Sequence, residues 1–298
     1  MFICTLVKGM EDNMALYLNG REIMGETYPN GELIFKLPMK GDYSEFEDNI
    51  QGVLVQRGVP NTAEVVVTYD SRIVEKMVIL GSYLQKRNIE LFEPSLSIYY
   101  FPYLRMDRDI ITDEGQFMPN VKELMEDVIF TYFKGWSIDT FDNHSEVDVP
   151  KYTEFIDRLV DSCVAKVVEQ EGVQVICYPD AGATRRYHRT DRDLPVVTAD
   201  KKRNTTTGQI EGIELNSLSV DLTGKTVLVV DDICSKGGTF MGIAKLLKEK
   251  GASRIICWFS HTEDTIFGGD IFKTDLIDHV YTTDSIDRTQ KHERLTVV

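Results

Sequence analysis

The sequence predicts an α/β protein with two domains, each built on a central, mainly parallel sheet flanked by helices. Short apolar runs alternate with longer segments in which apolar residues recur every three or four positions, which is the pattern of parallel α/β domains. This alternation occurs in both halves of the chain. The length of 298 residues suits one large or two medium domains, and the repeated pattern favours two.

The individual elements follow from these runs. Apolar runs that suit buried parallel strands are residues 64–69, 96–102, 135–139, 173–178, 194–198, 226–230 and 254–259. Segments with helical apolar spacing are residues 71–87, 120–132, 152–170 and 239–250. The polar stretch 143–151 is the best candidate linker, so we predict domains at residues 1–146 and 147–298. A second polar stretch, 200–215, has the composition of a mobile loop.

Composition and charge exclude several classes of protein. The formal net charge of −15 argues against unspecific attraction to nucleic acid or to an anionic membrane, so any phosphate chemistry must use local basic groups. Five scattered cysteines without a Cys-x-x-Cys pair argue for a reducing compartment and against a disulfide framework or zinc knuckle. The longest nearly apolar stretch, 95–104, is too short to span a bilayer. We therefore expect a cytoplasmic protein with no nucleic-acid or membrane partner.

The strongest motif follows the predicted strand 226–230. Two acids, Asp231 and Asp232, end this strand, and a glycine-rich turn then opens a helix; the turn is Ser235-Lys236-Gly237-Gly238-Thr239. Glycines allow close backbone approach to a phosphate, and N–H groups at a helix start face the anion. Adjacent carboxylates at a strand's carboxyl end suit ribose hydroxyls, contacted directly or through a metal. The alternative is that the acids only cap the helix and the glycines only make a tight turn.

This segment resembles the ribose-phosphate loop of the phosphoribosyl-diphosphate (PRPP) synthetases, also called ribose-phosphate pyrophosphokinases. In that family the loop has two acids, two variable residues, Asp-Thr, a small residue and Gly-Thr, whereas this chain has Ser235-Lys236 in place of Asp-Thr. The resemblance implies two tandem type I phosphoribosyltransferase-like domains. The N-terminal domain would carry the ATP segments, and the C-terminal domain the diphosphate, mobile catalytic and ribose-phosphate loops.

Further segments resemble the family in the same order along the chain. They are Tyr28-Pro29-Asn30-Gly31-Glu32 (adenine contact from a neighbouring subunit), Pro102-Tyr103-Leu104-Arg105-Met106-Asp107-Arg108 (ATP site), Asp142-Asn143-His144-Ser145 (metal), Pro179-Asp180-Ala181-Gly182 (diphosphate) and Lys201-Lys202-Arg203 (catalytic loop). This ordered set is far more specific than any one of its members.

The resemblance implies a role for each matched residue. Lys201 and Arg203 would be catalytic, and His144 and Asp180 would hold Mg²⁺. The implied ATP-binding residues are Tyr28, Asn30, Glu32, Arg105, Asp107 and His144. The implied diphosphate-binding residues are Asp180, Ala181 and Gly182, and the implied ribose-phosphate-binding residues are Asp231, Asp232, Ser235, Lys236, Gly237, Gly238 and Thr239.

Each segment taken alone also has a purely structural interpretation. These interpretations are a solvated or core histidine at His144, a solvated basic run at 201–203, an interface or core aromatic at Tyr28, a surface ion pair of Asp107 with its flanking arginines, and a simple turn at 179–182. In so acidic a chain, a basic run beside a polar stretch gains weight as a functional element.

By resemblance, the protein is a homo-oligomer that moves the β,γ-diphosphate of ATP onto the anomeric hydroxyl of ribose 5-phosphate, giving PRPP and AMP, with Mg²⁺ as cofactor. The change at Ser235-Lys236 removes an acid and adds a base where the family binds the sugar phosphate. A more cationic pocket would suit a diphosphate ester, so ADP-ribose is an alternative acceptor, in a step toward NAD resynthesis. Asn30 and Met106, which stand where the family has an acid and a Gln, leave adenine recognition open.

Two other functions remain as alternatives. A phosphoribosyltransferase that consumes PRPP would share the loop at 231–239 but would not need the ATP segment or His144. A non-catalytic subunit similar to PRPP synthetase would typically lose catalytic groups, whereas Lys201, Arg203, His144 and Asp180 are all present.

Overall fold

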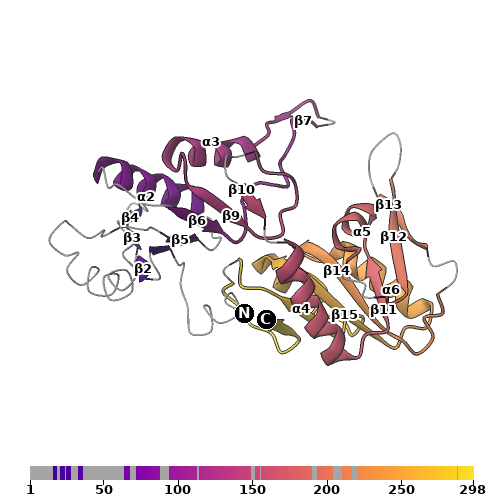
Figure 1. Cartoon of the computed structure of the whole chain (residues 1–298). Helices are drawn as coiled ribbons and strands as arrows, with labels where there is room; N and C mark the ends of the chain where they lie inside the picture. The colour runs from indigo at the N-terminus through magenta and orange to yellow at the C-terminus, as the bar shows by residue number, and fades with distance from the viewer. Residues whose placement is uncertain are drawn as a thin grey trace. The chain divides into compact units, whose positions relative to one another are not determined.

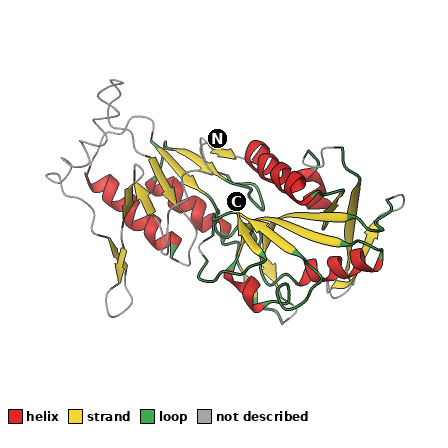
Figure 2. Ribbon diagram, turned by 90° about the horizontal axis from the view of Figure 1, so that it is seen from below, coloured by secondary structure: helices red, strands yellow, loops and turns green. Residues whose placement is uncertain are grey.

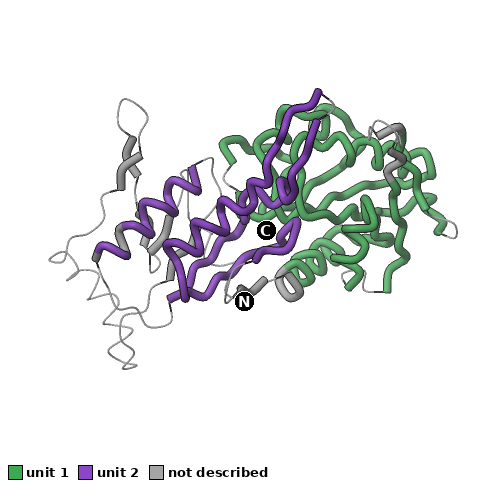
Figure 3. The backbone as a smooth tube through the Cα atoms, turned by 90° about the horizontal axis from the view of Figure 1, so that it is seen from above, with its two compact units in different colours: residues 1–12, 156–298 green, residues 13–155 purple. Residues whose placement is uncertain are grey.

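The computed structural model describes residues 72–87, 94–112, 114–148, 152–154, 156–189, 193–203, 210–216, 220–286 and 288–298, and the backbone of five short strands nearer the N-terminus. The chain forms two compact units (Figure 3). Unit 2 is Asn13–Phe155, and unit 1 contains Ile156–Val298. The division between the units, at 155/156, lies nine residues after the predicted boundary at 146/147.

Unit 2 contains a six-stranded sheet in the order β10-β9-β6-β5-β1-β2 (Figure 1). Its parallel strands are β5 (Glu64–Val67), β6 (Ser95–Ile98), β9 (Ser137–Thr140) and β10 (Tyr152–Glu154). Two antiparallel strands, β1 (Leu16–Leu18) and β2 (Arg21–Ile23), complete the other edge. Separate hairpins pair β3 (Gly25–Thr27) with β4 (Leu33–Phe35) and β7 (Ile110–Ile111) with β8 (Phe117–Met118).

The core of unit 2 lies between this sheet and two helices, α2 (Ile73–Arg87) and α3 (Lys122–Tyr132). Every second residue of the central strands faces the helices, so Leu96, Ile98 and Ile138 are buried. The helices contribute residues at helical spacing, Met77 with Leu80 and Met125 with Ile129. The periodicity that predicted these helices is therefore the periodicity that fills the core.

Unit 1 contains a seven-stranded sheet in the order β13-β12-β11-β14-β15-β16-β17. The strands are β11 (Val175–Tyr178), β12 (Val196–Arg203), β13 (Ile210–Asn216), β14 (Thr226–Cys234), β15 (Arg254–Thr262), β16 (His279–Thr282) and β17 (Leu295–Val297). All neighbours pair in parallel except β12 with β13. The helices are α4 (Ile156–Glu171), α5 (Ala181–Tyr187), α6 (Gly238–Glu249) and the 3₁₀ turn η1 (Asp264–Gly268).

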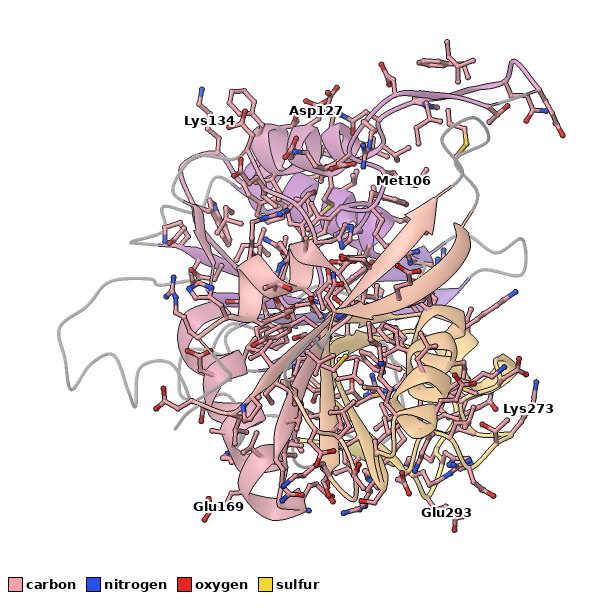
Figure 4. The ribbon with its side chains drawn as sticks, turned by 90° about the vertical axis from the view of Figure 1, so that its right-hand side faces the viewer. Met106, Asp127, Lys134, Glu169, Lys273 and Glu293 are labelled. Atoms are coloured by element: carbon pink, nitrogen blue, oxygen red, sulfur yellow. The ribbon has the colours of Figure 1, made fainter. Side chains whose placement is uncertain are left out.

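Helices lie on both faces of this larger sheet, which explains why its central strands are apolar throughout (Figure 2). On one face, Val229 and Cys257 pack with Ile243 of α6. The alternate residues, such as Leu228 and Ile256, are equally buried on the opposite face. Charged side chains such as Glu169, Lys273 and Glu293 extend outward from the unit (Figure 4).

The predicted α/β class with mainly parallel sheets is confirmed, and each predicted strand and helix has a counterpart at the expected place. Three local assignments were wrong. The predicted strand 96–102 ends at Ile98, as β6. The predicted helix 152–170 begins only at Ile156, because residues 152–154 pair with the open edge of β9 as β10. The predicted loop 200–215 is largely a hairpin of β12 and β13, in which Ile213 and Leu215 pack against the core. In the part of the chain that the structure describes, no helix has the length and apolar character required to cross a membrane.

Candidate functional site

The acid pair lies near the carboxyl end of β14. The strand continues past the predicted end at Val230, because β14 stays paired with β15 as far as Cys234. Asp231 stands opposite Phe259, and its Oδ1 accepts a hydrogen bond of 3.0 Å from the backbone N–H of Asp232. Asp232 is buried, and its Oδ2 is 3.4 Å from Nη1 of Arg186 on α5. Sequence reasoning missed Arg186, because nothing local to residue 186 points to β14.

The carboxylate of Asp180 also interacts electrostatically with this acid pair. Burial raises the pKa of Asp231 well above its usual range, and the charges of Asp232 and then Asp180 raise that pKa further. Asp180 follows β11, which is the neighbour of β14 in the sheet. The charge of Asp180 thus acts on the acid pair of β14, and negative charge concentrated in this way favours a cation.

The glycine-rich turn follows directly. The turn begins with Ser235 and Lys236 directly after β14, and Gly237 takes a left-handed conformation with φ of 80° just before α6 begins at Gly238. A left-handed residue at this point favours glycine. The first N–H groups of a helix have no intrahelical partner, so the start of α6 can receive a phosphate. The predicted strand-turn-helix context is therefore present.

A segment after η1 supports the back of this turn. A Cβ atom added at Gly269 would lie 2.0 Å from the backbone oxygen of Lys236, and one added at Gly237 would lie 2.2 Å from Cδ1 of Ile271. Only a glycine at 269 permits this approach. The one sequence signal for it was the pair Gly268-Gly269, which sequence reasoning did not use.

The predicted diphosphate segment forms the start of α5. Asp180 is the N-cap, and its Oδ1 accepts a 3.0 Å hydrogen bond from the N–H of Ala183. Ala181 and Gly182 are exposed in the first turn of the helix. This segment is therefore the capped start of a helix rather than a simple turn, and the charge of Asp180 also raises the pKa of Asp231.

In unit 2, the Arg105 and His144 segments follow the neighbouring strands β6 and β9. The hydroxyl of Ser145 donates a 2.9 Å hydrogen bond to the backbone oxygen of Leu104, so the two segments lie together. Arg105 and His144 are both exposed. Nε of Arg108 is 3.5 Å from Oδ1 of Asp107, so the surface ion pair is present, and such exposed pairs contribute little to stability.

Two residues in these segments have strained backbones. Tyr103 has φ of 65° and Asp142 has φ of 45°, values that non-glycine residues rarely adopt. Such strain persists where the surrounding structure imposes it, and it is concentrated at functional sites.

Met106, labelled in Figure 4, is held in place by its backbone. Its backbone oxygen accepts a 3.0 Å hydrogen bond from the N–H of Val121, just before α3.

Some predicted site residues cannot be placed in this way. Tyr28, Asn30 and Glu32 lie outside the described residues. For Lys201 and Arg203 the structure describes only the backbone, as the end of β12. His144 belongs to unit 2 and Asp180 to unit 1, so their joint magnesium site stays a prediction.

The donor chemistry bears on the implied Mg²⁺. Among the described residues, no group of three or more His, Cys, Asp or Glu side chains forms a ready metal cage. Mg²⁺ usually keeps several waters and takes one or two carboxylates together with substrate phosphates. One or two of the carboxylates of Asp180, Asp231 and Asp232 fit a donor set of that kind.

Comparison with known proteins gives consistent findings. Residues 160–265 match the phosphoribosyl transferase domain family. The chain is 31% identical over 200 residues to a ribose-phosphate pyrophosphokinase of Thermococcus kodakarensis, covering 64% of this chain and 65% of that protein. It is 28% identical over 202 residues to one of Vibrio parahaemolyticus, covering 63% and 60%. The match thus spans less than two thirds of either relative.

The fold also matches that of the phosphoribosylpyrophosphate synthetase from Mycobacterium smegmatis. The TM-score is 0.66 at 18% identity, and the match covers 93% of this chain and 85% of that one. The fold and the acid-glycine motif define an α/β protein with a phosphoribosyltransferase-type domain. The domain match and the curated relatives show that this chain is similar to the PRPP synthetases, and the shared fold agrees with that similarity.

Proposed function

We propose that this protein is a diphosphotransferase that moves the β,γ-diphosphate of ATP onto the anomeric hydroxyl of ribose 5-phosphate and releases AMP. The observation that carries the proposal is the acid pair at the end of β14, with the turn and helix start of a phosphate site directly after it. The names of the curated relatives support the same reaction.

The acceptor would bind to unit 1. Asp231 and Asp232 would accept hydrogen bonds from the ribose hydroxyls, and the N–H groups from Gly237 to Thr239 would receive the 5-phosphate. This arrangement fixes the sugar at two places, so the anomeric hydroxyl is held in one position. Because Asp231 has a raised pKa, binding of cationic or hydroxyl partners would favour loss of its proton.

In the transfer, the anomeric oxygen forms a bond to the β-phosphorus, and the bond from that phosphorus to the oxygen bridging the α-phosphate breaks. The hydroxyl proton is released to solvent water, and AMP leaves with the bridging oxygen. Lys201 and Arg203 would stabilise the charge that develops on this oxygen. Arg105, Asp107 and His144 would seat the nucleotide, and bound Mg²⁺, with His144 and Asp180 as its predicted ligands, would neutralise phosphate charge.

The second candidate is the same transfer to ADP-ribose. Lys236 is exposed on the turn, where the PRPP synthetases that the chain resembles have a neutral residue. An added cation at this position suits an acceptor whose ribose carries a diphosphate ester rather than a single phosphate. The observation favours an acceptor with more negative charge.

Product analysis distinguishes these functions. The full chain is incubated with Mg-ATP and either ribose 5-phosphate or ADP-ribose, and the products are identified by mass spectrometry. We expect AMP together with PRPP, or with the diphosphorylated form of ADP-ribose if that is the preferred acceptor. Absence of AMP with both acceptors would refute the proposal, and release of diphosphate from PRPP with a nucleobase would instead favour the phosphoribosyltransferase.

Gly269→Ala should weaken binding of the acceptor phosphate. The added Cβ would collide with the backbone oxygen of Lys236, so the turn must shift. We expect the KM for the acceptor to rise about 10- to 100-fold, as for other small displacements of binding groups. Gly268→Ala is the matched control, because nothing lies within 4 Å of a Cβ there. Equal KM values in the two variants would show that the contact does not hold the turn in place.

A further inference from the structure

We propose that Arg186 is a positioning residue for the acceptor sugar, which acts by holding the carboxylate of Asp232 in its binding orientation. The inference rests on the proposed role of Asp232 in binding ribose hydroxyls. It extends the site to a residue on a different element, since Arg186 lies on α5 and Asp232 on β14.

The contact between the two side chains is largely shielded from water. Nη1 of Arg186 is 3.4 Å from Oδ2 of Asp232, and the side chains are 21% and 7% exposed. Ion pairs in such positions are screened less than surface pairs. The guanidinium is planar, always charged and weakly hydrated, so it suits a partly buried carboxylate better than an ammonium group does.

The rest of α5 holds Arg186 in place. The hydroxyl of Tyr178 on β11 donates a 2.7 Å hydrogen bond to the backbone oxygen of Tyr187, the residue after Arg186. Both tyrosines are buried. The guanidinium carbon of Arg186 also lies 6.0 Å from the centre of the Tyr187 ring. At the other end of the helix, Asp180 caps the first turn.

The negative charge next to Asp232 explains why its carboxylate needs the contact with Arg186. Asp231 precedes Asp232 on β14, and its Oδ1 accepts a hydrogen bond from the N–H of Asp232, so two carboxylates lie close together here. Without the guanidinium, repulsion from Asp231 would favour rotation of the Asp232 carboxylate. With Arg186 at Oδ2, the carboxylate is held before the sugar arrives, so less orientational freedom is lost on binding.

The first test separates acceptor binding from turnover. In Arg186→Gln we expect the KM for the acceptor to rise about 10- to 100-fold, the size of effect typical of residues that orient a binding group. The KM for ATP should be unchanged and kcat should fall far less than the acceptor KM rises. Arg186→Lys should recover part of the loss, because it restores the charge without the planar fork. Arg185→Gln removes an exposed charge from the same helix and is the matched control.

A merely structural role predicts a different result. Loss of α5 packing would lower the fraction of active enzyme. The apparent kcat would then fall while the KM values for ATP and for the acceptor stayed at the wild-type level. Arg186→Lys would give no rescue. That outcome would overturn the proposal, as would wild-type kinetics in Arg186→Gln.

A double-mutant cycle tests whether the effect passes through Asp232. We expect Asp232→Asn and Arg186→Gln to be non-additive in acceptor affinity, so that the double variant binds little more weakly than Asp232→Asn alone. Fully additive losses would overturn the proposal. Calorimetric titration of the full chain with ribose 5-phosphate supplies the affinities without turnover. If wild type binds but releases no AMP, the proposed function fails and the cycle still tests Arg186.

Discussion

Replacing Lys201 with alanine is expected to lower kcat for AMP formation about 100- to 1,000-fold, with little change in the KM for the acceptor. The resemblance gives Lys201, near the end of β12, the role of a cation over the transferring diphosphate. A cation that meets charge only as the bond to the bridging oxygen breaks stabilises the transition state more than the bound substrate, and loss of such a group reduces kcat by this order. Initial rates of AMP release at saturating Mg-ATP and acceptor measure the effect.

Lys202→Ala provides the control for this experiment. It removes the same charge from the next residue of β12, so the net charge and the strand composition change equally. We expect Lys202→Ala to keep most of the activity and Arg203→Ala to lose it as Lys201→Ala does. Unchanged turnover in Lys201→Ala would show that the catalytic assignment carried over from the family is wrong.

Prediction from sequence succeeded where the signal was local. The apolar residues Val227 to Val230 predicted a strand buried on both faces, and β14 is such a strand, with helices on either side of its sheet. The acids, the glycines and the start of α6 are contiguous in the chain. Their mutual geometry is therefore fixed by one strand, one turn and one helix, which a sequence pattern can encode.

Prediction failed where topology decides the neighbours. Arg186 meets Asp232 because β11 and β14 are adjacent in the sheet, although β12 and β13 separate them in sequence. Gly269 meets Lys236 because the chain returns to the turn after β15. No local sequence pattern predicts either of these two contacts, because each depends on how the chain is arranged in the sheet.

The hairpin of β12 and β13 was missed for a different reason. The end of β12 and much of β13, the edge strand of the sheet, are polar, so their composition resembled that of a loop. Ile213 and Leu215, two residues apart, both pack against the core, as alternate residues of a strand do. Two apolar residues are too few for this alternation to predict a strand. Pairing with β12 supplies the backbone hydrogen bonds that composition cannot reveal.

Asp231→Asn is expected to stabilise the protein without ligands while removing most of its activity. Burial and the charges of Asp232 and Asp180 raise the pKa of Asp231 in the folded state. At neutral pH the ionised carboxylate is disfavoured by folding, so a neutral amide of the same shape relieves that strain. We expect a rise in Tm of about 2–4 °C, as for a gain near 1 kcal/mol, and a loss in kcat/KM of at least about 100-fold.

The pH dependence distinguishes this cause from others. An acid with a raised folded-state pKa destabilises the fold increasingly as pH rises from its unfolded pKa, near 3.8, through its folded pKa, and the effect is constant above that. The stability advantage of Asp231→Asn should therefore shrink as pH falls toward 4 and be largest at neutral pH, measured with chelator present. Asp275→Asn, at an exposed acid of the same unit, controls for the change in net charge. A lower Tm in Asp231→Asn, or a stability advantage that grows as the pH falls, would contradict this explanation. Either result would mean that the folded state favours the ionised carboxylate of Asp231. If Asp231→Asn raises stability and lowers activity, the carboxylate of Asp231 costs stability in the free protein. The fold would then retain that carboxylate because it binds the substrate or cation.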